Sequence, residues 1–82
     1  MYIYIFRFRS LSPMQLIVDN LLTATEAIQL LKLNQGDSRH EVATKCINEI
    51  GLPEIGKSVK YTLYHPTSSK PAYIGNAAVT TL

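Results

Sequence analysis

Residues 21–53 read LLTATEAIQLLKLNQGDSRHEVATKCINEIGLP, and this stretch decides the fold that we expect for the chain. Thr23 and Glu26 have the spacing of a capping box, in which the threonine hydroxyl and the glutamate carboxylate each accept from a backbone amide. The apolar residues recur at helical spacing, and they are Ala24, Ala27, Ile28, Leu30, Leu31 and Leu33. The pattern therefore predicts a helix over residues 22–33.

A second helix is predicted after a turn at residues 34–37. Ser38 and Glu41 have the spacing of another capping box. The apolar stripe that follows contains Val42, Ala43, Cys46, Ile47 and Ile50, and the outer face contains Arg39, His40, Thr44, Lys45, Asn48 and Glu49. Gly51 can adopt the left-handed backbone conformation that ends a helix, and Pro53 prevents the helix from continuing. Because neither helix can bury its apolar face alone, we expect the two to pack on each other.

The segment before the helices has the alternation of a β-strand. Residues 2–9 place Tyr2, Tyr4, Phe6 and Phe8 on one side, and Ile3, Ile5, Arg7 and Arg9 on the other. We interpret this segment as an amphipathic edge strand, and a short apolar stretch follows at residues 15–18. Met14 is an alternative translation start, in which case residues 1–13 are an extension. The expected division is an N-terminal strand or extension at residues 1–20 and the main domain at residues 21–82.

After Pro53, the apolar residues recur at every second position, as they do in a β-strand. Val59, Tyr61 and Leu63 alternate with polar residues, and residues 66–71 form a polar turn with a proline at each end. Residues 72–74 are the expected return strand. Residues 75–82 are interpreted as coil or a short strand, because they contain few charges and no helical pattern.

Composition narrows the class of protein. A chain of 82 residues is one domain by length, and its content of hydrophobic and charged residues is that of a globular protein. A net charge of +2 permits an anionic partner without requiring one. The single Cys46 cannot form an intramolecular disulfide, which favours a reducing, cytoplasmic location. No apolar run is long enough for a transmembrane helix, so no membrane partner is expected.

With the helices placed, the sequence resembles excisionase-type, MerR-like winged helix-turn-helix domains over residues 21–61. Residues 21–33 are similar to the family's opening helix, which typically begins Leu-Thr-x-x-Glu-Ala-x-x-Leu-Leu. Ser38, Arg39 and Val42 match the start of its recognition helix, and residues 51–53 match the Leu-Pro near that helix's end. Residues 54–61, EIGKSVKY, are similar to the family's wing.

The resemblance implies an α+β fold: a small winged helix-turn-helix with two core helices, a β-hairpin wing and an extra N-terminal strand. It implies sequence-specific binding to double-stranded DNA, as an excisionase-like recombination directionality factor or a small transcriptional regulator. Base contacts would come from Arg39, His40 and Thr44, with Lys45 further along, and phosphate contacts from Lys57, Lys60 and Lys70. A recombinase partner and a homodimer or cooperative array are also implied, because one copy would bind weakly.

No cofactor, metal site or enzymatic activity is expected. His40 and His65 lack the clustered Cys, Asp or Glu of a metal site and are interpreted as solvent-exposed. Cys46 and His40 point to different faces of a helix, so they do not form a nucleophile and base pair.

Two alternatives to DNA binding stay open. One is a β-grasp, ubiquitin-like protein-interaction module, which requires a strand at residues 28–33. The other is a dimerisation module that uses the aromatic face of residues 2–8.

Overall fold

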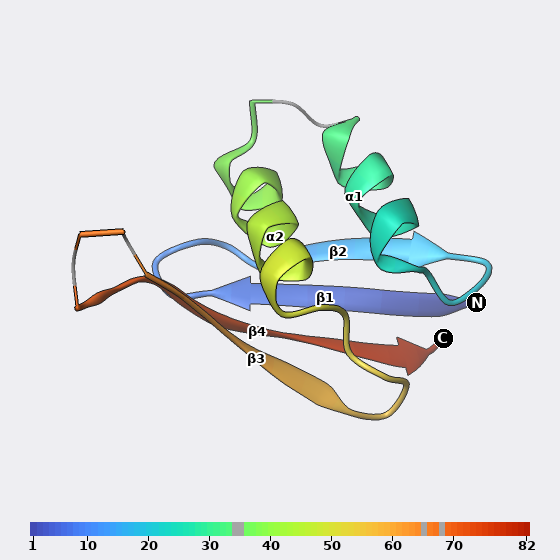
Figure 1. The fold of residues 1–82 in the computed structure, drawn as a ribbon. Helices are drawn as coiled ribbons and strands as arrows, with labels where there is room; N and C mark the ends of the chain where they lie inside the picture. Colours follow the sequence, from blue (N-terminus) through green and yellow to red (C-terminus); the bar gives the residue numbers. More distant parts are fainter. Residues whose placement is uncertain (34–35, 65, 68) are drawn as a thin grey trace.

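The computed structural model describes residues 1–33, 36–64, 66–67 and 69–82, and it is an α+β fold with two helices and a four-stranded antiparallel sheet (Figure 1). The elements are β1 (Tyr2–Phe8), β2 (Met14–Val18), α1 (Ala24–Lys32), α2 (Ser38–Glu49), β3 (Ser58–Tyr64) and β4 (Pro71–Thr81). Both helices lie on one face of the sheet, and the other face carries no helix (Figure 1). The α+β class and the hairpin after the helices are therefore confirmed.

The strand order is β2-β1-β4-β3, so β1 is an inner strand. It pairs with β2 from Tyr2 to Phe6 and with β4 along its whole length. The prediction of an edge strand is therefore wrong. The reason is that the C-terminal segment, interpreted as coil or a short strand at residues 75–82, continues the return strand and pairs with β1 through Thr81. Its small residues give little β-propensity signal, although Ala77 and Val79 are buried.

Residues 1–20 are continuous with the rest of the fold. They supply β1 and β2, and β1 joins β2 to β4 within a single sheet. A chain that began at Met14 would lack β1 and its buried residues Tyr4, Phe6 and Phe8. These aromatic side chains pack in the core, so the aromatic face proposed for dimerisation is not available at the surface.

The core lies between the helices and the covered face of the sheet. Its buried residues are Tyr4, Phe6, Phe8, Met14, Ala27, Leu31, Val42, Ala43, Cys46, Ile47, Tyr61, Leu63, Ala77 and Val79. The two predicted apolar helix stripes and the alternating strand residues contribute to this one core. Burial of these side chains is the main favourable term in folding.

The first helix begins at Ala24, two residues later than the predicted start, and the predicted residue Thr23 is its N-cap. Thr23 Oγ1 accepts from the Glu26 amide at 3.2 Å, and Glu26 Oε1 accepts from the Thr23 amide at 3.0 Å. The capping box is therefore confirmed. Because residues 24–32 are helical, the strand that a β-grasp fold requires at residues 28–33 is absent from the described residues there.

The second helix has a different cap from the one predicted. Asp37 is its N-cap, and its carboxylate accepts from the Arg39 amide at 2.9 Å, while Ser38 is already helical. Ser38 and Glu41 therefore do not form the predicted capping box. Aspartate and serine are comparable N-cap residues, so sequence spacing did not separate the two. The helix ends where expected, with Gly51 at a φ of 111°.

Replacing Thr23 with alanine is expected to lower the free energy of unfolding by about 1 kcal/mol, because the Glu26 amide loses its acceptor. The control is Thr25→Ala, on the exposed side of the same helix, where alanine is the better helix former. Urea denaturation of both variants measures the difference. Equal destabilisation by the two substitutions would contradict a specific role for the capping box.

Neither helix of the described chain is long and apolar enough to cross a membrane.

Candidate nucleic-acid interface

Arg39 connects the start of α2 to the loop between β1 and β2. Its guanidinium donates to both carboxylate oxygens of Asp37, at 3.2 Å and 2.8 Å, and to Ser12 Oγ and the Pro13 carbonyl oxygen, at 3.0 Å and 3.1 Å. The hydrogen bonds from the Arg39 side chain, and then from its amide, lower the pKa of the Asp37 carboxyl to about 2. The predicted base-contacting arginine is thus held by contacts within the chain.

His40 is buried, with 9% of its surface exposed. Its Nδ1 lies 3.0 Å from Asp37 Oδ2, in a contact that lacks the alignment of a hydrogen bond. The prediction that His40 is exposed on the outer face of the helix is therefore wrong. His40, Ala43 and Ile47 follow helical spacing, so His40 extends the buried stripe by one turn. His65 lies outside the described residues.

Three of the predicted residues, His40, Thr44 and Lys45, line one open hollow between the helices. Its volume is about 670 Å³, and Leu31, Lys32, Gly36 and Glu41 complete its lining. The Thr44 hydroxyl donates to the His40 carbonyl oxygen at 2.8 Å. This bond engages the hydroxyl proton with the helix backbone.

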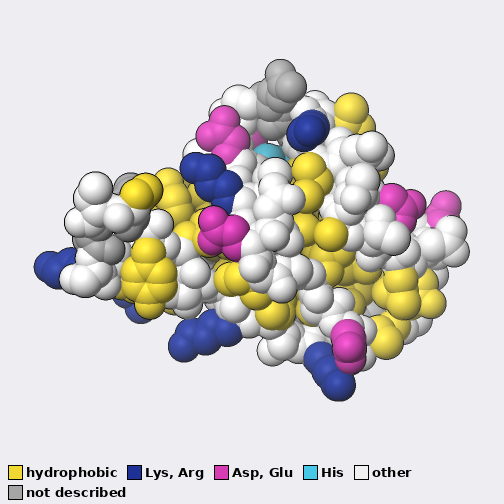
Figure 2. All heavy atoms as spheres, viewed as in Figure 1, with side chains coloured by type: hydrophobic (Ala, Val, Ile, Leu, Met, Phe, Trp, Pro, Cys, Tyr) yellow, Lys and Arg dark blue, Asp and Glu magenta, His cyan; other side chains and the backbone are white. Residues whose placement is uncertain are grey.

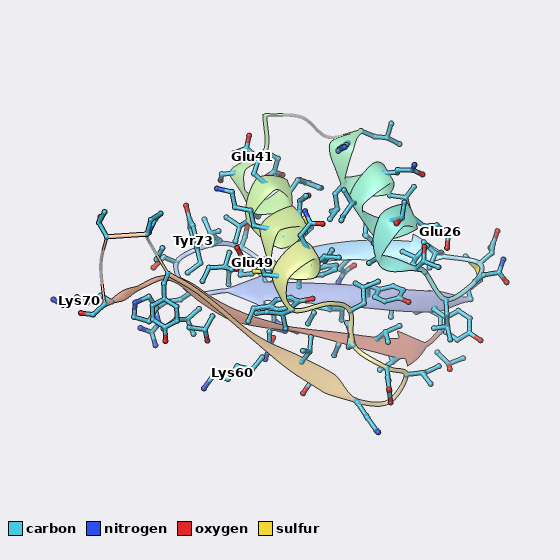
Figure 3. The ribbon with its side chains drawn as sticks, in the orientation of Figure 1. Glu26, Glu41, Glu49, Lys60, Lys70 and Tyr73 are labelled. Atoms are coloured by element: carbon cyan, nitrogen blue, oxygen red, sulfur yellow. The ribbon has the colours of Figure 1, made fainter. Side chains whose placement is uncertain are left out.

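The exposed face of α2 carries charges of both signs. Glu41, Lys45 and Glu49 are spaced four residues apart, so they are neighbours along one side of the helix. Figure 3 shows Glu41 and Glu49 on α2, and Figure 2 shows acidic and basic side chains intermingled over this region. The two carboxylates offset the positive charge of Lys45.

The predicted wing residues lie in different places. Lys57 Nζ is 3.2 Å from Glu54 Oε2, and both side chains are largely exposed. Lys60 extends from β3 on the side opposite the helices, whereas Lys70 lies at the far end of the β3–β4 hairpin (Figure 3). The predicted residues therefore do not form one continuous surface.

The uncovered face of the sheet brings Lys60, which the sequence interpretation assigned to the wing, together with Arg7 and Arg9, which it did not assign to a site. Arg7 pairs with Asn76 across β1 and β4, and Asn76 pairs with Lys60 across β4 and β3. These three residues form a cross-strand row, which we name the basic row. Arg9 lies beside it, and all four line an open hollow of about 510 Å³.

None of the four strands contains an acidic residue. All six Asp and Glu residues of the chain lie in helices, turns and loops outside the four strands. Among the described residues, no ion pair involves Arg7, Arg9 or Lys60. The basic row is therefore a concentration of unpaired positive charge on a chain whose net charge is only +2.

One signal for this surface was present in the sequence. The alternation of residues 2–9 already placed Arg7 and Arg9 on the same side of a strand. Lys60 joined them only through the pairing of β4 with both β1 and β3.

The other end of the uncovered face is apolar. Ile3 and Ile5 of β1 and Ala78 of β4 are partly buried there, and Ile17 of β2 is exposed. They share this face because they alternate with the core-facing residues. The uncovered face thus has a basic end and an apolar end.

The described residues contain no group of three His, Cys, Asp or Glu side chains arranged to hold a metal ion. Cys46 is buried in the core, and burial, with a smaller effect of Glu49, raises the pKa of its thiol to about 11. A protonated, inaccessible thiol is a poor nucleophile at neutral pH. Cys46 therefore packs as a small hydrophobic residue, as expected.

Comparisons of the chain with protein-family models, with curated proteins and with solved structures find no match.

Proposed function

We propose that this protein binds nucleic acid through the basic end of the uncovered sheet face. The observation that carries the proposal is the basic row with Arg9 beside it, on strands free of carboxylates. Phosphate groups supply most of the electrostatic affinity in nucleic-acid complexes, and Arg and Lys are the side chains that bind them. An open face with several unpaired cations suits a polyanion better than a small neutral ligand.

The sheet is a better candidate than α2 for this contact. A recognition helix presents base-reading side chains from its first turns. Here Arg39 is bonded to Asp37 and to the β1–β2 loop, and His40 is buried. The mixed charges further along α2 reduce its attraction for phosphate.

The winged helix-turn-helix resemblance supports a more specific form of the proposal. In that form the β3–β4 hairpin is the wing, Lys57, Lys60 and Lys70 hold the phosphates of duplex DNA, and the protein acts beside a recombinase or at a promoter. Lys60 belongs to both forms, so the two share their first test, which is salt-dependent binding.

A second candidate is a protein-interaction module, which the apolar end of the uncovered face favours. Ile17 is 56% exposed, and aliphatic neighbours continue from it across β1. Binding through such a patch depends weakly on salt, because apolar burial and not counterion release drives it. Salt dependence therefore separates the two candidates.

Binding to labelled nucleic acid is expected to weaken by about 20- to 40-fold between 50 mM and 200 mM salt, if about three phosphates are neutralised. The combined change Arg7→Glu and Lys60→Glu is expected to lower affinity by at least about tenfold, and to bring the salt slope toward zero. Fluorescence anisotropy with mixed single- and double-stranded oligonucleotides provides the measurement.

The matched control is Lys32→Glu with Lys45→Glu, which changes the net charge equally but lies on the helices. It is expected to affect binding much less. Absence of salt-dependent binding at micromolar protein would end the proposal. Greater loss in the helical pair than in the sheet pair would assign binding to the helices instead. Circular dichroism of each variant verifies that it is folded.

A further inference from the structure

We infer that the ligand of the basic row is a single-stranded polynucleotide in preference to a duplex, an inference that rests on the proposed function. Single strands of DNA and RNA share a phosphodiester backbone and bases that are not paired with a partner strand. Three features of the uncovered face favour this ligand: its width, the position of Asn76, and the aliphatic surface beside the row.

The sheet is too wide to enter the major groove of an undeformed duplex. Adjacent strands lie about 4.8 Å apart, so the axes of the outer strands in a four-stranded sheet are about 14 Å apart before side chains are added. The major groove of B-DNA is only about 12 Å wide, and it admits a helix or a two-stranded ribbon. The uncovered face would therefore touch only the phosphates bordering a groove, whereas a single strand can lie flat on it.

Asn76 occupies the middle of the basic row. It is exposed and lies between Arg7 and Lys60. The Cα atoms of Arg7 and Lys60 are about 10 Å apart, because β4 lies between β1 and β3. No side-chain hydrogen bond of Asn76 occurs within the described residues, and asparagine is disfavoured in strands, so the fold gives no reason for it. Its amide offers both a donor and an acceptor, the combination that reads the edge of an unpaired base.

Aliphatic side chains lie next to the row on the same face. Ile74 lines the hollow together with the basic residues. Ile5 precedes Arg7 by two residues on β1, so the two side chains lie on the same face of the strand. Ile74 and Ile5 are both partly buried and keep some apolar surface exposed. The faces of unstacked bases can pack on such surfaces, whereas the faces of bases within a duplex are covered by stacking. Single strands thus gain contacts that a duplex cannot make.

The test compares three probes of one mixed sequence about 16 nucleotides long: single-stranded DNA, single-stranded RNA and duplex DNA. Anisotropy titrations at the same low salt are expected to show a single strand bound at least about tenfold more tightly than the duplex. Tighter binding of the DNA or of the RNA single strand supports the inference equally, and identifies which sugar the face accepts.

Asn76→Ala is expected to weaken single-strand binding by about 3- to 10-fold while leaving the salt slope unchanged, because the amide is uncharged. Asn48→Ala, at an exposed position on α2, is the matched control and is expected to have no effect. An Asn76→Ala variant that binds as the unmodified protein does would overturn the base contact.

The outcomes separate this inference from the proposed function. Duplex bound as tightly as the better-bound of the two single strands, or more tightly, overturns the single-strand preference and leaves nucleic-acid binding standing. Failure of all three probes to bind overturns the proposed function, and the preference with it.

Discussion

Tyr61→Ala is expected to remove about 3–5 kcal/mol from the free energy of unfolding. A domain of this length has about 4–12 kcal/mol in total, so the substitution is expected to remove a large fraction of the stability. Tyr61 has 0% of its surface exposed, and its ring stacks with Phe6 at 6.5 Å and Phe8 at 6.2 Å between centroids. Alanine would leave a cavity between the sheet and the helices.

The hydroxyl of Tyr61 makes a separate contribution that a second variant isolates. It donates to the Gly51 carbonyl oxygen at 2.7 Å, which ties β3 to the segment that ends α2. Burial, with a smaller effect of Cys46, raises the pKa of this phenol above its usual range, so the donor keeps its proton. Tyr61→Phe retains the ring and is expected to cost only about 1–2 kcal/mol.

Urea denaturation followed by circular dichroism measures both effects, with Tyr64→Ala as the control at an exposed position of the same strand. Tyr61→Ala is expected to destabilise the protein most, Tyr61→Phe less, and Tyr64→Ala least. If Tyr61→Ala proved no more destabilising than Tyr61→Phe, the stacked rings could not be central to the core.

Gly75→Ala is expected to destabilise the protein by about 2–3 kcal/mol through overpacking. A Cβ at this position would collide with the Arg7 carbonyl oxygen and would come within 2.6 Å of Phe8 Cδ1. The sign of the effect is informative, because alanine in place of glycine within a strand otherwise reduces the entropy lost on folding.

The reason for the close approach lies in the register of the sheet. Gly75 pairs with Phe8 on β1 and with Tyr61 on β3, so it is the residue between two stacked rings. Without a side chain there, the rings meet across β4. Thr80→Ala, at an exposed position of the same strand, is the control. Thermal or urea denaturation in which Gly75→Ala matched or exceeded the unmodified protein in stability would contradict this packing.

Patterns contained within a few residues were the ones that the sequence predicted correctly. The capping box of α1 depends on two side chains three residues apart, and the end of α2 depends on Gly51 and Pro53. The second cap was misassigned because Asp37 and Ser38 are adjacent and both suit the role. The sequence interpretation places His40 on the outer face because histidine is polar, although its spacing to Ala43 and Ile47 continues the buried stripe by one turn.

The long strand β4 and the candidate site were harder to predict for a common reason. Residues 75–79 are small or weakly patterned, and what makes them a strand is pairing with β1 on one side and β3 on the other. The same pairing places Arg7, Asn76 and Lys60 in one cross-strand row, although the three residues lie far apart in the sequence. No periodicity in either segment indicates that they meet.

The sequence alone determined the two helices, the cap that begins the first, the glycine that ends the second, and the alternation that divides β1 and β3 into two faces. Short-range physics sets these features, through hydrogen bonds to free amides and the repeat of apolar residues. The tertiary structure alone decided the strand order, the face that the helices cover and the residues exposed together on the other face. Those depend on contacts between distant segments, whose partners are selected by packing of the whole core.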